Sequence, residues 1–136
     1  MGAWSVDPFG NDDAADWDYE LEEADSLSPI EEAIDAVLSS GDDYLEAPQA
    51  CVAIAAIEVL ARLGGHSGEK TSHTEAVDKW VASVQLKPPV ELIDKAQAAL
   101  ARILAENSEL AELWQDSDDH DAWQASMDDL QARVGA

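Results

Sequence analysis

The segment "APQACVAIAAIEVLARLGG", residues 47–65, decides the fold of this chain. A proline stands near its start and a pair of glycines at its end, and both are typical boundary signals of a helix. Between Ala50 and Leu60 the only charged residue is Glu58, so the helix is apolar on almost every side. Helices of this kind are buried. We therefore expect this segment to be the central, most buried element.

The other periodic segments also repeat their apolar residues with the spacing of a helix. In "PIEEAIDAVLSSG", residues 29–41, one stripe contains Ile30, Ala33, Ile34, Val37 and Leu38. Ser28 can cap that helix, and Gly41 can end it. Further stripes lie within residues 72–84, 87–107 and 120–134, with a short helix around 108–114. In the second of these segments, Glu91 and Lys95 have the spacing of a favourable pair.

No stretch alternates as a strand does, and no low-complexity linker divides the chain. The sequence predicts one all-α domain over residues 1–136, a single compact bundle of about six helices joined by short loops. Residues 1–11 are expected to form an N-terminal aromatic segment that packs on the first helices.

Charge is the most unusual property of the composition. The sequence contains thirty Asp and Glu but only seven Lys and Arg, and the formal net charge is −23. From Met1 to Ala61 there are sixteen acids and no base, and Arg62 is the first cation. Such a field repels nucleic acids and anionic lipids and attracts cations and basic protein surfaces. Solubility, or adaptation of a whole proteome to salt or acidity, is the alternative explanation of the charge.

Cysteine content and hydropathy predict a cytoplasmic protein without a membrane partner. Cys51 is the only cysteine, so no internal disulfide forms, which is compatible with a reducing compartment. The N-terminus lacks the pattern of a secretion signal. The longest apolar run, Ala50–Ile57, is far shorter than the ~20 residues that span a bilayer. The Cys51 thiol lies in this run, where burial raises the pKa of a thiol and leaves it inert.

The segment "DSDDHD", residues 116–121, is the candidate metal site of the sequence. Its candidate ligands are Asp116, Asp118, His120 and Asp121. The segment resembles the start of a calcium loop, but it lacks Gly at the sixth position and Glu at the twelfth. Asp118 or Asp119 as the cap of the last helix explains part of the pattern without a metal. We predict no cofactor.

The first residues, "MGAWSVDPFGNDDAADWDYEL", predict a turn at 8–11 and then a helix through 13–24. Asn11 or Asp12 can cap this helix, and Ala14, Trp17 and Leu21 share one face of it. Trp4 and Phe9 can fold back against that face, as in a hydrophobic staple. Every member of the motif then has a structural role; its members are Trp4, Phe9, Asn11, Asp12 and Trp17.

The same stretch resembles the N-terminal signature of a bacterial family, domain of unknown function 4259. The matching residues are Met1, Gly2, Trp4, Phe9, Asn11, Asp12, Ala14, Asp16 and Trp17. The segments at residues 43–61 and 108–134 are also similar to the middle and end of such proteins. The resemblance covers nearly the whole chain and implies no activity.

Three functions fit this sequence. The first is a non-enzymatic protein that docks a basic protein partner, as an immunity protein or an inhibitor does, through Asp12, Asp13, Asp16, Asp18, Glu22 and Glu23. A mimic of DNA charge is a special case of this function. The DNA-charge mimic counts as the second function. The third is a divalent-metal-dependent enzyme that uses Asp12, Asp13 and Asp16, or the 116–121 cluster with His120. The sequence favours the non-enzymatic protein and predicts no oligomeric state.

Overall fold

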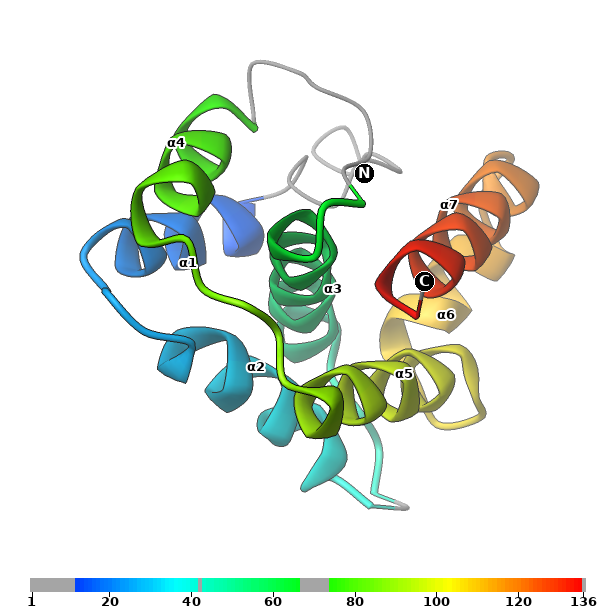
Figure 1. Cartoon of the computed structure of the whole chain (residues 1–136). Coiled ribbons are helices and arrows are strands. Elements are labelled where there is room, and N and C mark those ends of the chain that lie inside the picture. The colour runs from blue at the N-terminus through cyan, green and yellow to red at the C-terminus, as the bar shows by residue number, and fades with distance from the viewer. Residues whose placement is uncertain (1–11, 42, 67–73, 136) are drawn as a thin grey trace.

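Helix α3 (Ala47–Leu63) is the axis around which the chain folds (Figure 1). The fold is known from a computed structural model that describes residues 12–41, 43–66 and 74–135. In this part of the chain α3 packs against each of the other six helices. These are α1 (Asp12–Glu22), α2 (Ser28–Leu38), α4 (Glu75–Val84), α5 (Val90–Leu104), α6 (Glu109–Gln115) and α7 (His120–Val134).

The all-α prediction is confirmed, but the described residues form seven helices where about six were expected. The chain turns between α6 and α7, where the Ser117 hydroxyl accepts a hydrogen bond from the Asp119 N–H at 3.0 Å. This turn separates the seven-residue α6 from the last helix. The only β-type pairing among residues 12–41, 43–66 and 74–135 is an isolated bridge between Leu45 and Ser108.

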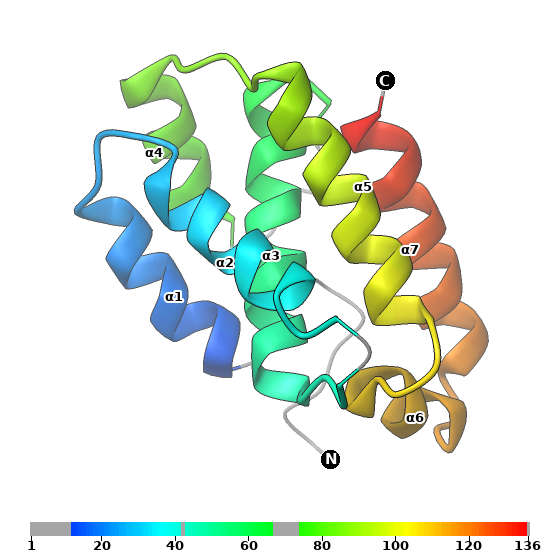
Figure 2. The same ribbon diagram turned by 90° about the horizontal axis from the view of Figure 1, so that it is seen from below.

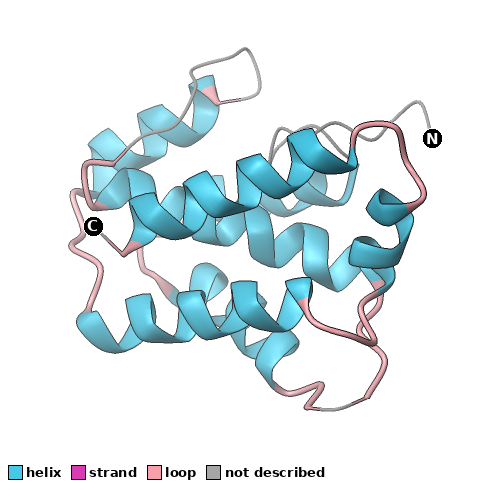
Figure 3. Cartoon of the chain, turned by 90° about the vertical axis from the view of Figure 1, so that its right-hand side faces the viewer, coloured by secondary structure: helices cyan, strands magenta, loops and turns pink. Residues whose placement is uncertain are grey.

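The helices form two groups on opposite sides of α3. Helices α1, α2 and α4 lie on one side and α5, α6 and α7 on the other, and the two views agree (Figures 1 and 2). Helix α2 connects the groups, because it packs against both α3 and α5. Figure 3 shows the described chain as helices joined by short connections. None of these helices is long and apolar enough to cross a lipid bilayer.

The central position of α3 follows from its sequence as predicted. From Ala50 to Arg62 every residue except the half-buried Val52 is buried. The glycine pair ends the helix in a Schellman motif, in which the His66 N–H donates to the Ala61 carbonyl and the Gly65 N–H to the Arg62 carbonyl. Gly65 has a φ of +87°, a conformation that glycine adopts without steric cost.

The first turn of α3 is capped by a side chain from another helix. Glu109, the first residue of α6, accepts a hydrogen bond from the Ala47 N–H at 2.7 Å. At α2, by contrast, Ser28 is the first helical residue, and its own N–H donates to the Ser26 hydroxyl at 3.4 Å. Ser28 as the cap of α2 is therefore wrong, whereas Asp119 holds the predicted N-cap position of α7 without accepting a hydrogen bond from the helix.

The predicted apolar stripes form the core. Ala14, Trp17 and Leu21 of α1 are all buried, as is the α7 stripe of Trp123, Met127, Leu130 and Val134. Trp123 stacks on Trp114 of α6 with ring centroids 5.9 Å apart. Trp80 of α4 donates from Nε1 to the carbonyl of Ala24, just after α1, at 2.8 Å. Trp4, Phe9 and Asn11 lie outside the described residues, so their packing on Trp17 stays a prediction.

Arg102 links the loop between α2 and α3 to the loop between α5 and α6 by hydrogen bonds. Its guanidinium donates to the carbonyls of Gly41 and Asp43, between α2 and α3. It also donates to the carbonyls of Glu106 and Asn107, between α5 and α6. Five N–H donors in one rigid plane suit such multiple contacts to backbone oxygens. Arg102 therefore serves the fold with its hydrogen bonds, although its charge is one of only seven positive ones in the sequence.

Candidate functional site

The outward face of α1 carries a row of acidic side chains with an aromatic ring among them. Asp16, Tyr19 and Glu20 of the helix and Glu23 directly after it are all exposed, and their spacing places them along one side. Tyr19 exposes 71% of its surface. We call these four residues the α1 face. An exposed tyrosine between carboxylates offers both ring area and negative charge to a partner.

The residues predicted to bind a partner lie in different environments on α1. Asp16, Glu22 and Glu23 are exposed, whereas Asp13 and Asp18 are half-buried. Asp12 is the first residue of the helix, and its side chain lies outside the description. The sequence prediction did not include Tyr19 and Glu20, although their positions three and four residues after Asp16 indicated the same face.

Asp18 differs from the exposed acids in its solvation. Its Oδ1 atom is buried and has no hydrogen-bond partner among the described residues. Burial, and to a smaller extent the charge of Glu22, raises the pKa of Asp18 to about 6. A carboxylate in this position is poorly solvated, so it costs stability when it is charged. Asp18 therefore differs from the exposed acids of the α1 face in its burial and its raised pKa, and we do not count it among them.

Few cations neutralise the acids of the first two helices. Glu31 and Glu32 of α2 are exposed, as the α1 face is. Among the described acids of α1 and α2, Asp35 alone forms an ion pair, with Lys95 of α5 at 3.1 Å. This contact replaces the expected pair of Lys95 with Glu91 on its own helix. The uncompensated charge of α1 and α2 thus persists after folding.

The predicted metal ligands lie at the turn between α6 and α7. Asp116, Asp118 and Asp121 are exposed, and the His120 Nδ1 lies 3.8 Å from an Asp121 carboxylate oxygen. Within residues 12–41, 43–66 and 74–135, no three His, Cys, Asp or Glu side chains are grouped so that they could hold a metal ion. The metal site and the metal-dependent enzyme both stay predictions.

The structure also contains a charged cluster that the sequence prediction missed. Glu58 exposes 2% of its surface and Arg62 4%, and the two side chains bond to each other at 3.1 Å. Arg62 bonds in addition to Asp78 of α4 at 2.7 Å. Arg133 of α7 donates to both carboxylate oxygens of Glu58 and also pairs with Asp129. These five residues, which we call the buried ion cluster, join α3, α4 and α7.

The buried ion cluster is built to hold helices together. The hydrogen bonds from Arg133 to Glu58, followed by those to Asp129, raise the pKa of the Arg133 guanidinium. The sequence signal for part of the cluster was the i,i+4 spacing of Glu58 and Arg62 in an otherwise apolar helix. Each charged side chain of the cluster is paired with an opposite charge in the same cluster, so we assign the cluster a structural role.

Cys51 shows the inert character expected of it. The residue exposes 2% of its surface. Burial, with smaller contributions from the charges of Asp13 and Glu109, raises the pKa of its thiol to about 12. A thiol that ionises only at such a pH is not a nucleophile under physiological conditions.

Comparison with known proteins bears on the resemblance of the first residues to a bacterial family. No curated protein and no solved structure matched the chain. The family described as domain of unknown function (DUF4259) matches residues 2–126. Glu58, Arg62 and Asp78 lie within this match, whereas Arg133 lies beyond it. Since the match covers most of the sequence, the chain belongs to the DUF4259 family.

Proposed function

We propose that this protein is a non-enzymatic binding protein that docks a basic protein partner through the α1 face and the neighbouring acids of α2. The observation that carries the proposal is the row of exposed, unpaired carboxylates on α1 with Tyr19 71% exposed among them. In the described part of the chain, the acids of the α1 face have no ion-pair partner, so a partner's cations would not have to displace internal ones.

Charge and chemistry select the class of partner. A chain with a net charge of −23 attracts basic surfaces over long distances and accelerates their association. At close range, arginine and lysine side chains can pair with the carboxylates of Asp16, Glu20 and Glu23, and they can pack on the ring of Tyr19. A tyrosine adds apolar contact area that charge alone does not supply.

A binding measurement with matched variants tests the proposal. Basic proteins captured from a lysate at low salt are identified, and the affinity of each for the purified protein is then measured. Replacement of Asp16, Glu20 and Glu23 by Asn, Gln and Gln is expected to weaken binding at least about tenfold. The control replaces Glu91, Asp94 and Glu106, which are exposed on or just after α5, in the same way.

The control changes the net charge by the same amount at another place, so it separates a docking face from bulk charge. Equal weakening in both variants would show that only net charge matters and would overturn the proposal. The proposal also fails if basic proteins are retained no better than on an unrelated acidic domain of equal charge. Tyr19→Ala should weaken binding as well, without any change in charge.

A further inference from the structure

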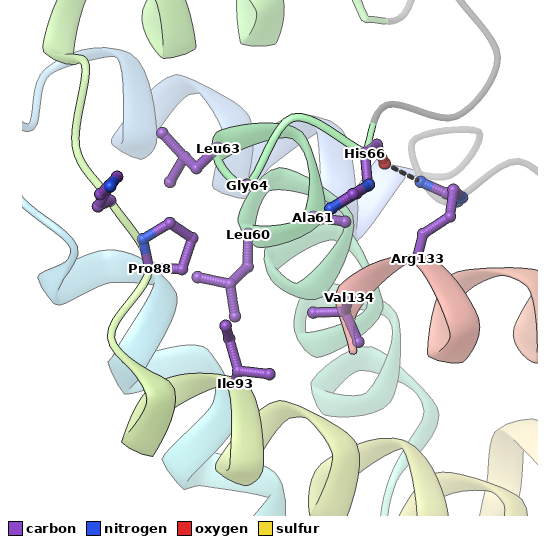
Figure 4. A pocket seen from close by; sticks show the side chains of 10 residues that line it. Leu60, Ala61, Leu63, Gly64, His66, Pro88, Ile93, Arg133 and Val134 are labelled. Carbon is purple, nitrogen blue, oxygen red and sulfur yellow. Dashed lines mark hydrogen bonds between the residues drawn. The ribbon is translucent and has the colours of Figure 1, made fainter. Parts of the chain in front are cut away.

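A pocket lies where the C-terminal ends of α3 and α7 meet the connection between α4 and α5 (Figure 4). Its volume is about 330 Å³, within the range of ~300–1,000 Å³ that small-molecule sites occupy. None of the acids assigned to the docking of a partner lines this pocket. The pocket is therefore independent of the proposed function.

Most of the pocket wall is apolar. Figure 4 shows Leu60 and Ile93 directed toward each other, with Pro88 and Leu63 on one side of them and Val134 on the other. Leu60 and Val134 are buried in the core, and Ile93 is half-buried against it. A wall of this kind favours a hydrocarbon group, because its burial removes apolar surface of both ligand and protein from water.

The charge of the pocket is opposite to that of the rest of the chain. The ten described residues that line it include Lys87, Arg133 and His66, and none of these ten is Asp or Glu. The whole sequence, by comparison, contains thirty acids and seven bases. A negatively charged ligand is repelled by most of the molecule, and a wall whose described residues include no acid relieves this repulsion locally.

Of the two lining cations, Lys87 is the one available to a ligand. The Arg133 guanidinium already bonds to the carboxylates of Glu58 and Asp129 and to the His66 carbonyl, as the dashed line in Figure 4 indicates. Its charge is therefore neutralised within the fold. Lys87 is exposed and has no ion-pair partner among the described residues, so its three N–H donors remain for an anion.

We propose that this pocket binds a small molecule with an apolar body and one carboxylate group. The apolar body packs against Leu60, Ile93 and Val134, and the carboxylate pairs with Lys87. The hydrocarbon contacts supply affinity, whereas the single charged contact selects an acid over an alcohol or an amine of the same length.

The test uses octanoate as the probe and follows the methyl signals of the isotope-labelled protein by NMR during a titration. We expect saturable binding with shifts at Leu60, Ile93 and Val134. Octan-1-ol and octylammonium should bind more weakly. Lys87→Gln should lower the affinity for octanoate about tenfold. The control, Lys79→Gln, removes another exposed lysine that does not line the pocket, and it should leave the affinity unchanged.

Three outcomes would overturn the proposal. The first is the absence of saturation at octanoate concentrations up to about 10 mM. The second is an equal effect of Lys87→Gln and Lys79→Gln, and the third is a set of shifts centred away from the pocket. Ile93→Trp, which fills the pocket, should abolish octanoate binding while the circular dichroism spectrum stays helical. If that variant does not fold, the two lysine variants still decide the question.

Discussion

Arg133, in the last turn of α7, donates from Nη1 and Nη2 to the two carboxylate oxygens of Glu58 in α3, at 2.8 and 2.6 Å. The two residues are 75 positions apart in the sequence. Glu58 also accepts from Arg62, which holds Asp78 of α4. One buried carboxylate thus connects three helices, and it is the natural first target for mutation.

Glu58→Gln is expected to destabilise the protein strongly. The change removes the negative charge that compensates two guanidinium groups, and breaking a buried pair in this way costs about 3–5 kcal/mol. Urea denaturation followed by circular dichroism measures the loss. Asp129→Asn is the matched control, because the Asp129 side chain is 63% exposed and its pair with Arg133 contributes at most about 1 kcal/mol. Similar losses in the two variants would contradict a central role for Glu58.

Asp18→Asn is expected to stabilise the protein at neutral pH. The pKa of Asp18 is about 6 in the folded protein and near 3.8 in the unfolded chain, so the folded state binds the proton more tightly. Its contribution to stability is therefore full below pH 3.8 and is lost as the pH rises through about 6. At pH 8 the charged carboxylate destabilises the fold, and the amide removes this cost.

Thermal unfolding between pH 4.5 and 8 checks this expectation for Asp18. The variant should melt about 3 °C or more above the wild type at pH 8, and the difference should shrink toward pH 4.5. Asp16→Asn is the control, since it removes one charge from the exposed side of the same helix. If both variants shift Tm equally at every pH, the effect belongs to net charge, and the burial of Asp18 is not its source.

Salt should stabilise this protein. The chain has thirty acids and only seven bases, so its carboxylates repel one another in the compact state. Added ions screen that repulsion. We expect Tm to rise as sodium chloride is increased from low to moderate concentration, and also as the pH falls from neutral to mildly acidic. A Tm that does not depend on salt would show that the acids are already compensated, for example by bound cations.

Cys51 should react only when the protein opens. Its thiol is 2% exposed and its pKa is raised to about 12, so neither access nor ionisation favours reaction at pH 8. In Ellman's assay the native protein should release almost no thionitrobenzoate, and the reaction should become complete in urea. Rapid labelling of the native protein would show that the first turns of α3 open far more readily than their packing implies.

The sequence by itself determined the helices and which of their faces are buried. Both properties repeat at short spacing along the chain, as in the stripe from Trp123 to Val134 and the apolar segment that became α3. Such signals need only neighbours three or four positions away, so they can be interpreted without knowledge of the fold. The N-terminal signature likewise identified the family.

Tertiary structure decided which distant side chains meet. Lys95 pairs with Asp35 of α2 although Glu91 stands at the favourable local spacing, and Glu109 caps α3 from 62 positions away. The same holds for the burial of Asp18 and for the pocket beside Lys87. These contacts depend on the angles and offsets at which whole helices pack, and packing is set by the interlocking of many core side chains at once. No local spacing in the sequence encodes that geometry.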